Sequence, residues 1–351
     1  MLLFENRRLE TNIVRGRRGG FELILVVIAL AGGILSIGYG PSNAPKKSTA
    51  SSLKFEPTAA RLERGRYIVE GPAHCFQCHS EVNWEAPGAQ PKAGKKAGGT
   101  VFPEKGMEWL IAPNISPDVE TGSGTWTDEQ FARAIREGIG HDGRRLFPMM
   151  PYMNFREMSD EDLASVVVYV RSLAPVSNRL PKAALPDVVK NSLPPHQPIT
   201  SSVPGPDMSN PVARGKYLVT LGNCALCHTP MKDGQSVTEL SFGGGMTFDG
   251  PWGKITSANI TKDPSGISYY DENLFIEVIR TGQVRARKLN SIMPWGYFRN
   301  MSDDDLKAIF AYLRTLPPVK HRVDNTEEAT ECPVCKGKHG YGEKNHHIAS
   351  E

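Results

Sequence analysis

RGRYIVEGPAHCFQCH at residues 64–79 and RGKYLVTLGNCALCH at residues 214–228 are the two stretches that decide the fold of this chain. Each starts with Arg-Gly, carries a tyrosine two residues later, and ends in two cysteines and a histidine spaced as C-x-x-C-H. Such self-similarity at a long period indicates a duplicated structural unit. The sequence therefore predicts one module used twice, in a chain of 351 residues that is long enough for two domains.

Two further pairs of segments support the duplication. PNISPDVETGSGTWTDEQF at 113–131 matches ANITKDPSGISYYDENLF at 258–275, and the segments at 150–173 and 293–316 both begin with Met-Pro. The closing segment of each unit has the apolar periodicity of an amphipathic helix. Its apolar positions are Leu163, Val166, Val167, Val170 and Leu173 in the first unit, and Leu306, Ile309, Phe310, Leu313 and Leu316 in the second.

Helix boundaries are also encoded locally. Ser159 and Ser302 precede acidic first turns, as N-cap residues do. Thr127, with Gln130 three residues on, predicts a capping box at the start of another helix, which Gly138 ends. Gly282 plays the same part in the second unit. Strand-like alternation is scarce, so the predicted fold is mainly α, with long loops.

The C-x-x-C-H strings predict covalent attachment of two c-type haems. Two thiols add to the two vinyl groups on one porphyrin edge, and the next residue places its imidazole under the iron. A redox-active disulfide or half a zinc site would explain the cysteines but not the adjacent histidine in both copies. The predicted haem-binding residues are Cys75, Cys78 and His79 in the first unit, and Cys224, Cys227 and His228 in the second.

Each iron needs a sixth ligand, and a methionine thioether is usual in electron carriers because it favours iron(II). Met150 and Met293 stand at equivalent places, each before a proline that restricts the backbone to extended conformations. We predict that these two ligate the haem irons. Met158 and Met301 also align but directly precede helix N-caps, where core packing is expected. Two more methionines, Met149 and Met153, lack counterparts.

Three other groups of residues have weaker assignments. Four arginines before the Met-Pro steps would either neutralise haem propionates or lie on a solvated loop: Arg144, Arg145, Arg285 and Arg287. Asn114 and Asn259 match glycosylation sequons, but we expect them to shape loop turns by bonding the backbone. Tyr67 with Tyr169, and Tyr217 with Tyr312, are expected to pack where the first and last helices of each unit cross.

The first 20 residues carry five arginines and two glutamates, so this segment alone has the +3 net charge of the whole chain. The remaining charges cancel, without the basic patches of a nucleic-acid-binding protein. Residues 20–40 form an apolar run long enough to span a bilayer. We predict a cytoplasmic segment at 1–19, a transmembrane anchor at 20–40 and a tether at 41–58, with the rest exported to the periplasm. A cleaved signal peptide is the alternative.

The predicted domains are residues 59–175 and 211–323. Residues 176–210 between them are rich in proline and lack apolar periodicity, which predicts a stiff, extended linker. The polar tail at 324–351 contains CPVCKGKH at 332–339. Three interpretations of the tail remain open: a zinc site, a disulfide, or a third haem with Lys336 as ligand. The zinc site would use Cys332, Cys335, His339 and one of His346 or His347.

Each unit resembles a class I cytochrome c domain, and the tandem is similar to the membrane-bound cytochrome c subunits of gluconate and alcohol dehydrogenases. The resemblance covers residues 60–180 and 210–325 and rests on the shared motifs RG-x-Y, C-x-x-C-H, N-I-[ST]-x-D, M-P-[YW] and M-S-D. The resemblance implies a periplasmic subunit that takes electrons from a flavin or quinoprotein dehydrogenase. Those subunits typically carry three haem domains, whereas this chain has two.

The predicted function is therefore electron transfer in a periplasmic respiratory chain. The donor would be a dehydrogenase or quinol-oxidising complex, and the acceptor an oxidase or soluble carrier. The chain would not be an enzyme in itself. A dihaem peroxidase is the enzymatic alternative, but it needs one iron with a displaceable ligand, and the matched Met-Pro steps argue against this. A redox sensor would need an output domain, which the short N-terminal segment cannot hold.

Overall fold

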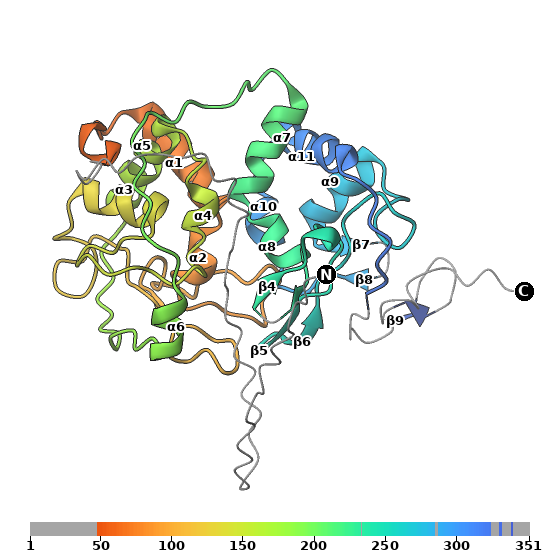
Figure 1. Ribbon diagram of the computed structural model, residues 1–351, viewed down its shortest axis with the longest axis horizontal. Helices are drawn as coiled ribbons and strands as arrows, with labels where there is room; N and C mark the ends of the chain where they lie inside the picture. Colours follow the sequence, from red (N-terminus) through yellow and green to blue (C-terminus); the bar gives the residue numbers. More distant parts are fainter. Residues whose placement is uncertain (1–47, 233, 285–286, 324–329, 332–337, 340–351) are drawn as a thin grey trace, which may run out of the picture.

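The computed structural model describes residues 48–323 except 233 and 285–286, together with 330–331 and 338–339. The predicted anchor at 20–40 and most of the tail lie outside this part of the chain. Within the described residues, no helix combines the length and the apolar character needed to cross a membrane. Figure 1 shows two mainly helical units side by side, joined by the linker.

The two units repeat the same order of helices. In the first, a 3₁₀ turn η1 (Thr49–Ser52) precedes α1 (Ala59–Glu70), α2 (Cys75–Cys78), α3 (Asp128–Glu137), α4 (Tyr152–Phe155) and α5 (Asp160–Arg171). In the second, the helices are α7 (Pro211–Leu221), α8 (Cys224–His228), α9 (Glu272–Thr281), α10 (Trp295–Phe298) and α11 (Asp303–Thr315), with a 3₁₀ turn η2 (Thr238–Leu240) after α8.

The strands are short and pair only as two-stranded antiparallel ribbons within the described residues. The first unit has β1 (Thr100–Val101) with β2 (Ile111–Ala112). The second has β3 (Met231–Lys232) with β4 (Gln235–Ser236), β5 (Thr247–Gly250) with β6 (Gly253–Thr256), and β7 (Gln283–Val284) with β8 (Arg287–Lys288). In the tail, β9 (Thr330–Glu331) pairs with β10 (Lys338–His339). The mainly α prediction is thus confirmed.

The predicted helix caps are confirmed. The Ser159 and Ser302 side chains accept hydrogen bonds from the amides of Asp162 and Asp305, at the starts of α5 and α11. Thr127 and Gln130 form the reciprocal capping box of α3. Gly138 and Gly282 end α3 and α9 in the left-handed conformation, at φ 67° in both.

The Arg-Gly step of the duplicated motif lets the first and last helices of each unit cross closely. A Cβ atom on Gly65 would lie 2.0 Å from the Ser165 carbonyl oxygen of α5. A Cβ on Gly215 would lie 1.9 Å from the Ala308 carbonyl oxygen of α11. Only glycine therefore fits at these two crossings, and the crossings hold the apolar stripes of α5 and α11 against the cores.

The linker is not a free spacer. It contains α6 (Asp187–Ser192), and Val189 and Leu193 are buried in a small apolar cluster with Leu110 and Phe147 of the first unit. Arg145 donates hydrogen bonds to the carbonyl oxygens of Leu193, Pro194 and Lys190. Figure 1 shows α6 lying against the first unit. The prolines make the linker extended, and its few apolar side chains attach it to that unit.

The two units exchange side chains across their junction. The Tyr217 hydroxyl of α7 donates to Asp162 (2.7 Å) and accepts from the Ser159 amide (3.0 Å), so it caps the last helix of the other unit. Tyr67 of α1 does the same in the opposite direction, donating to Asp305 and accepting from the Ser302 amide (2.9 Å). Tyr169 and Tyr312 lie at the helix crossings, beside Gly65 and Gly215, as the sequence predicts. The hydroxyls of Tyr67 and Tyr217 reach further and join the two units.

Candidate haem-binding sites

Each C-x-x-C-H segment forms one helical turn. Its cysteines stand three residues apart, so α2 and α8 carry both thiols on neighbouring positions of one helix face. The residue before the first cysteine is in the left-handed conformation in both units, His74 at φ 37° and Asn223 at φ 54°. This turn starts the short helix abruptly after α1 or α7. All four cysteines of these turns are half-buried, and no disulfide joins them.

The buried thiols differ from those of redox motifs. Burial raises the pKa of Cys75 to about 12 and that of Cys78 to about 11, and burial raises the pKa of Cys224 and Cys227 to about 12. Redox-active C-x-x-C motifs need the opposite, a pKa lowered to about 7 or less. The environment therefore argues against a disulfide exchange site in either unit.

The two histidines are held in the same way. The Nδ1 atom of His79 lies 2.9 Å from the Pro113 carbonyl oxygen, and that of His228 lies 2.7 Å from the Ala258 carbonyl oxygen. A carbonyl oxygen can only accept, so Nδ1 carries the proton and Nε2 keeps its lone pair for a metal. Burial lowers the pKa of both imidazoles, which favours this neutral form.

The loops that supply these carbonyl groups are shaped by the sequon asparagines. Asn114 Oδ1 accepts from the amide (3.0 Å) and hydroxyl (2.7 Å) of Ser116, and Nδ2 donates to the Val176 carbonyl (2.7 Å). Asn259 makes the matching bonds to Thr261 and to the Val319 carbonyl (2.8 Å). Both side chains are buried, so they serve as loop anchors, as the sequence indicated.

The methionines fall into two groups. Met158 and Met301 are each 1% exposed and pack inside the cores, as expected. Met150 and Met293 are half-buried at the edges of those cores. Each directly precedes the proline that begins α4 or α10. Their assignment as sixth ligands stays a prediction.

The residues fit a covalently bound haem in both units. Two thiols on one helical turn, a half-buried histidine whose Nδ1 is bound to a carbonyl so that Nε2 is available, and an adjacent apolar core are the donors and surroundings that c-type haem needs. The predicted propionate partners fit less well. Arg144 pairs with Asp142, and Arg145 binds the linker. Arg287 lies in β8, and Arg285 lies outside the described residues.

The tail is largely beyond what the structure describes. Cys332, Cys335 and His346 lie outside the described residues, and His339 falls in β10. Among the residues that are described, no group of three or more His, Cys, Asp or Glu side chains is placed to hold a metal ion.

Side chains around the two attachment segments meet at the junction between the units. Burial and then the Cys78 thiol raise the pKa of Cys227. Tyr297 of α10 packs into the core of the first unit, where burial and then Cys78 and Cys75 raise the pKa of its phenol. His74 and Phe298 make an edge-to-face contact, 5.4 Å between ring centroids.

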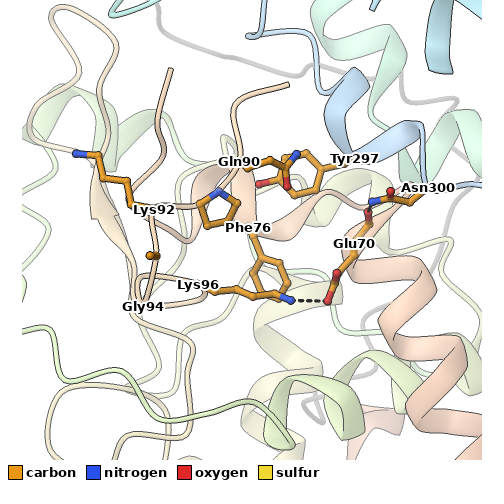
Figure 2. A pocket seen from close by; sticks show the side chains of 10 residues that line it. Glu70, Phe76, Gln90, Lys92, Gly94, Lys96, Tyr297 and Asn300 are labelled. Atoms are coloured by element: carbon orange, nitrogen blue, oxygen red, sulfur yellow. Dashed lines mark hydrogen bonds and ion pairs between the residues drawn. The ribbon is translucent and has the colours of Figure 1, made fainter. Parts of the chain in front are cut away.

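A cleft of about 290 Å³ opens at this junction, beside the first attachment segment. Figure 2 shows its lining from both units, with Lys96 turned toward Glu70 at 2.6 Å. The Lys96 ammonium also lies 4.9 Å from the centre of the Phe76 ring. Asn300 of the second unit donates to the Glu70 carbonyl oxygen (2.8 Å), which closes one side of the cleft.

Sequence reasoning missed the polar contacts between units that surround the sites. Gln77 reaches the loop before Met293, and Asn154 of α4 donates to Asn223 Oδ1 (2.7 Å), next to Cys224. Neither contact has a local signature. The sequence holds one indication of the first contact: Gln77 is polar, whereas the equivalent position in the second motif is Leu226.

A duplicated helical unit with a buried C-x-x-C-H turn in each copy defines a c-type cytochrome. The chain belongs to the Cytochrome c family, whose profile matches residues 62–174 and again 212–317. It is an electron-transfer protein made of two tandem cytochrome c domains, a class that carries covalently bound haem c.

Three relatives illustrate what the chain is similar to. It is 27% identical over 336 residues to the alcohol dehydrogenase (quinone) cytochrome c subunit of Gluconobacter oxydans, covering 90% of this chain and 65% of the relative. It is 29% identical to the gluconate 2-dehydrogenase cytochrome c subunit of Pantoea cypripedii, covering 77% and 62%. It is 28% identical to a diheme cytochrome c-type protein of Cereibacter sphaeroides, covering 70% and 83%. The chain thus spans less than two thirds of the dehydrogenase subunits' length.

Proposed function

We propose that this chain is a membrane-anchored dihaem cytochrome c that carries electrons on the outer side of a bacterial inner membrane. The observation that carries the proposal is the duplicated histidine geometry. In both units Nδ1 is bound to a backbone carbonyl, 2.9 Å away for His79 and 2.7 Å for His228, so that Nε2 remains to ligate iron.

The chain's own residues would have distinct tasks at each site. Cys75 with Cys78, and Cys224 with Cys227, would anchor the porphyrin by thioether bonds. His79 and His228 would be the proximal ligands, and Met150 and Met293 the sixth ligands. When bound, the two haems supply reversible one-electron chemistry. A six-coordinate iron with a methionine ligand suits electron transfer rather than peroxide turnover, so we propose a carrier and not an enzyme.

The relatives support a dehydrogenase as electron donor. Two of them are named as cytochrome c subunits of alcohol and gluconate dehydrogenases. By analogy, this chain would take electrons from a dehydrogenase or quinol-oxidising complex and deliver them to an oxidase or soluble cytochrome. The apolar run at 20–40 would hold the domains in the periplasm beside these partners.

The tail adds a separate and smaller proposal. The sequence is compatible with two states of the tail. The first is a zinc ion bound by Cys332, Cys335, His339 and His346, and the second is a disulfide between the two cysteines. Metal analysis of the purified full chain, with thiol counting after denaturation, separates the two.

The proposal is tested by the denatured mass of the full chain isolated from washed membranes. We expect the mass of two haems beyond that of the polypeptide. The double variant Cys75→Ala with Cys78→Ala should retain one haem, and so should Cys224→Ala with Cys227→Ala. A polypeptide with one haem or none, or a chain recovered only in the soluble periplasmic fraction, would contradict the proposed dihaem or anchored state respectively.

A further inference from the structure

The loop that carries Met293 is fixed within its own unit by Asn290. The Asn290 Oδ1 atom accepts from the Ile292 amide (3.0 Å), and its Nδ2 donates to the Trp252 carbonyl oxygen (2.9 Å). The Met293 amide donates to the Asn290 carbonyl oxygen (3.2 Å). These contacts leave the carbonyl groups of Ser291 and Ile292 to be bound from elsewhere.

Gln77 of the other unit binds both of these carbonyl groups. Its Nε2 atom lies 2.9 Å from the Ile292 oxygen and 3.3 Å from the Ser291 oxygen. The side chain is 7% exposed, so water competes little for these bonds. Gln77 lies between Cys75 and Cys78, inside the turn that attaches the first haem. One attachment turn therefore touches the residue directly before the other unit's methionine.

The attachment turn of the second unit does not make an equivalent contact with the loop before Met150. The position equivalent to Gln77 is Leu226, which has no side-chain donor. The Met150 amide binds the Phe147 carbonyl oxygen (3.1 Å), just as the Met293 amide binds the Asn290 carbonyl oxygen, so this backbone bond is common to both loops. The nearest polar contact from the second unit is that of Asn223 with Asn154, four residues after Met150. The two methionine loops are therefore supported differently, and the three residues before the methionine also differ, Phe147-Pro148-Met149 in the first unit and Asn290-Ser291-Ile292 in the second.

We propose that Gln77 is a positioning residue for Met293, and that it makes the second haem's methionine ligand depend on contact with the first unit. This inference rests on the proposed function, in which Met293 ligates the second iron. Two hydrogen bonds to the carbonyl groups just before Met293 restrict the loop and so keep the sulfur near the iron. Without them the loop gains freedom, and the weak thioether–iron bond opens more often.

The test uses the full-length holoprotein with Gln77→Leu, which gives the first motif the residue that the second already has. In the iron(III) state, we expect the weak far-red methionine–iron charge-transfer band to fall by about half, as expected for one of two haems. In the iron(II) state, carbon monoxide should bind one haem per chain, with apparent affinity raised roughly tenfold, because the open form is more populated. The reduction potential of that haem should fall, since methionine favours iron(II).

Three further variants complete the design. Gln77→Glu keeps the side-chain shape but removes the donor, and should act like Gln77→Leu even if the leucine variant folds poorly. Met293→Ala identifies the signals of the second haem. Asn300→Ala removes another bond between the units, to Glu70, without touching the Met293 loop, and should change none of these signals.

The outcomes separate this inference from the proposed function. Wild-type signals in both Gln77 variants, or a change at the first haem instead of the second, would overturn the role of Gln77 while leaving the dihaem carrier intact. Equal changes in Asn300→Ala would also overturn it, because loosening of the junction would then be the cause. If the wild-type second haem already binds carbon monoxide freely, Met293 is not its ligand and the ligand assignment itself fails.

Discussion

At the scale of single residues, the histidine of each C-x-x-C-H motif depends on a neighbouring asparagine that shapes its loop. Asn259 stands next to Ala258, whose carbonyl oxygen holds His228, and its amide joins that loop to the chain after α11. Asn114 does the same beside Pro113. The N-I-[ST] motif is therefore a structural requirement of the histidine site in both units.

Replacing Asn259 by alanine should cost about 2–3 kcal/mol in the free energy of unfolding, because the buried Thr261 amide would lose its partner and the Val319 carbonyl would keep only the long bond from Ser265. Chemical denaturation of the holoprotein measures this cost. Asn273→Ala, at an exposed position of α9, is the matched control and should stay within about 0.5 kcal/mol of wild type. A similar small change for both variants would show that Asn259 does not anchor the loop.

At the scale of elements, the linker is fastened to the first unit by two carboxylates. Glu137 accepts from Ser48, from the Ile199 amide (3.2 Å) and from His196 (3.0 Å). Asp160 accepts from Ser202 (2.6 Å) and the Val203 amide (3.2 Å), and pairs with Arg136. Burial alone would raise the pKa of both carboxyl groups, but these hydrogen bonds outweigh it and hold each pKa below its ordinary value.

This arrangement predicts that acid releases the linker. A carboxyl group whose pKa is lowered in the folded state contributes its full stabilisation when the pH is above its ordinary pKa. That ordinary pKa is 4.5 for Glu137 and 3.8 for Asp160. The contribution is lost as the pH falls through the folded-state pKa. Amide hydrogen exchange at residues 196–203 should therefore accelerate below about pH 4 relative to the helix cores.

The variant Glu137→Gln with Asp160→Asn supplies the control for the linker. The amide side chains of this variant keep the shape of the carboxylates but do not titrate. Amide exchange in the linker should therefore already be faster than in the wild type at neutral pH. After correction for the intrinsic exchange rate, it should show little further acceleration in acid. An unchanged pH profile in this double variant would place the acid-sensitive groups elsewhere.

The element scale also shows what a sequence can and cannot reveal. The caps at Ser159, Ser302 and Thr127 were predictable because a cap is a bond between residues three positions apart. The attachment of the linker was not predictable, since the one helical pair, Val189 with Leu193, is too short a pattern to indicate a buried face. The direction of the Tyr67 and Tyr217 hydroxyls depends on how the two units pack against each other. The apolar periodicity of a single sequence reports on the helices within a unit and says nothing about that packing.

At the scale of the whole molecule, the two units form a pseudo-symmetric pair. Each contributes a tyrosine that caps the last helix of the other, at a buried aspartate that also pairs with an arginine of its own unit: Arg64 with Asp162, and Arg214 with Asp305. The Arg-Gly-x-Tyr motif thus serves both the helix crossing and the junction. This arrangement places both C-x-x-C-H turns beside the junction, where Gln77 and Asn223 make contacts with the other unit.

Removing both hydroxyls should loosen the junction. In the double variant Tyr67→Phe with Tyr217→Phe, two buried aspartates and two helix amides have fewer hydrogen-bond partners. Each substitution should lower the free energy of unfolding by about 1–2 kcal/mol. Calorimetry should show one cooperative transition for the wild type and two resolved transitions for the double variant. Tyr312→Phe, which removes a half-buried hydroxyl from α11, should keep the single transition. One unshifted transition in the double variant would mean that apolar contacts alone hold the units together.

The central claim is that both irons are six-coordinate electron carriers, and the carbon monoxide difference spectrum of the dithionite-reduced, full-length protein tests it most directly. We predict no spectral change, because in the proposed assignment Met150 and Met293 would occupy the sixth positions of the two haems. Ready binding of carbon monoxide by one haem per chain would contradict that assignment and make peroxide turnover the leading explanation of the duplicated site.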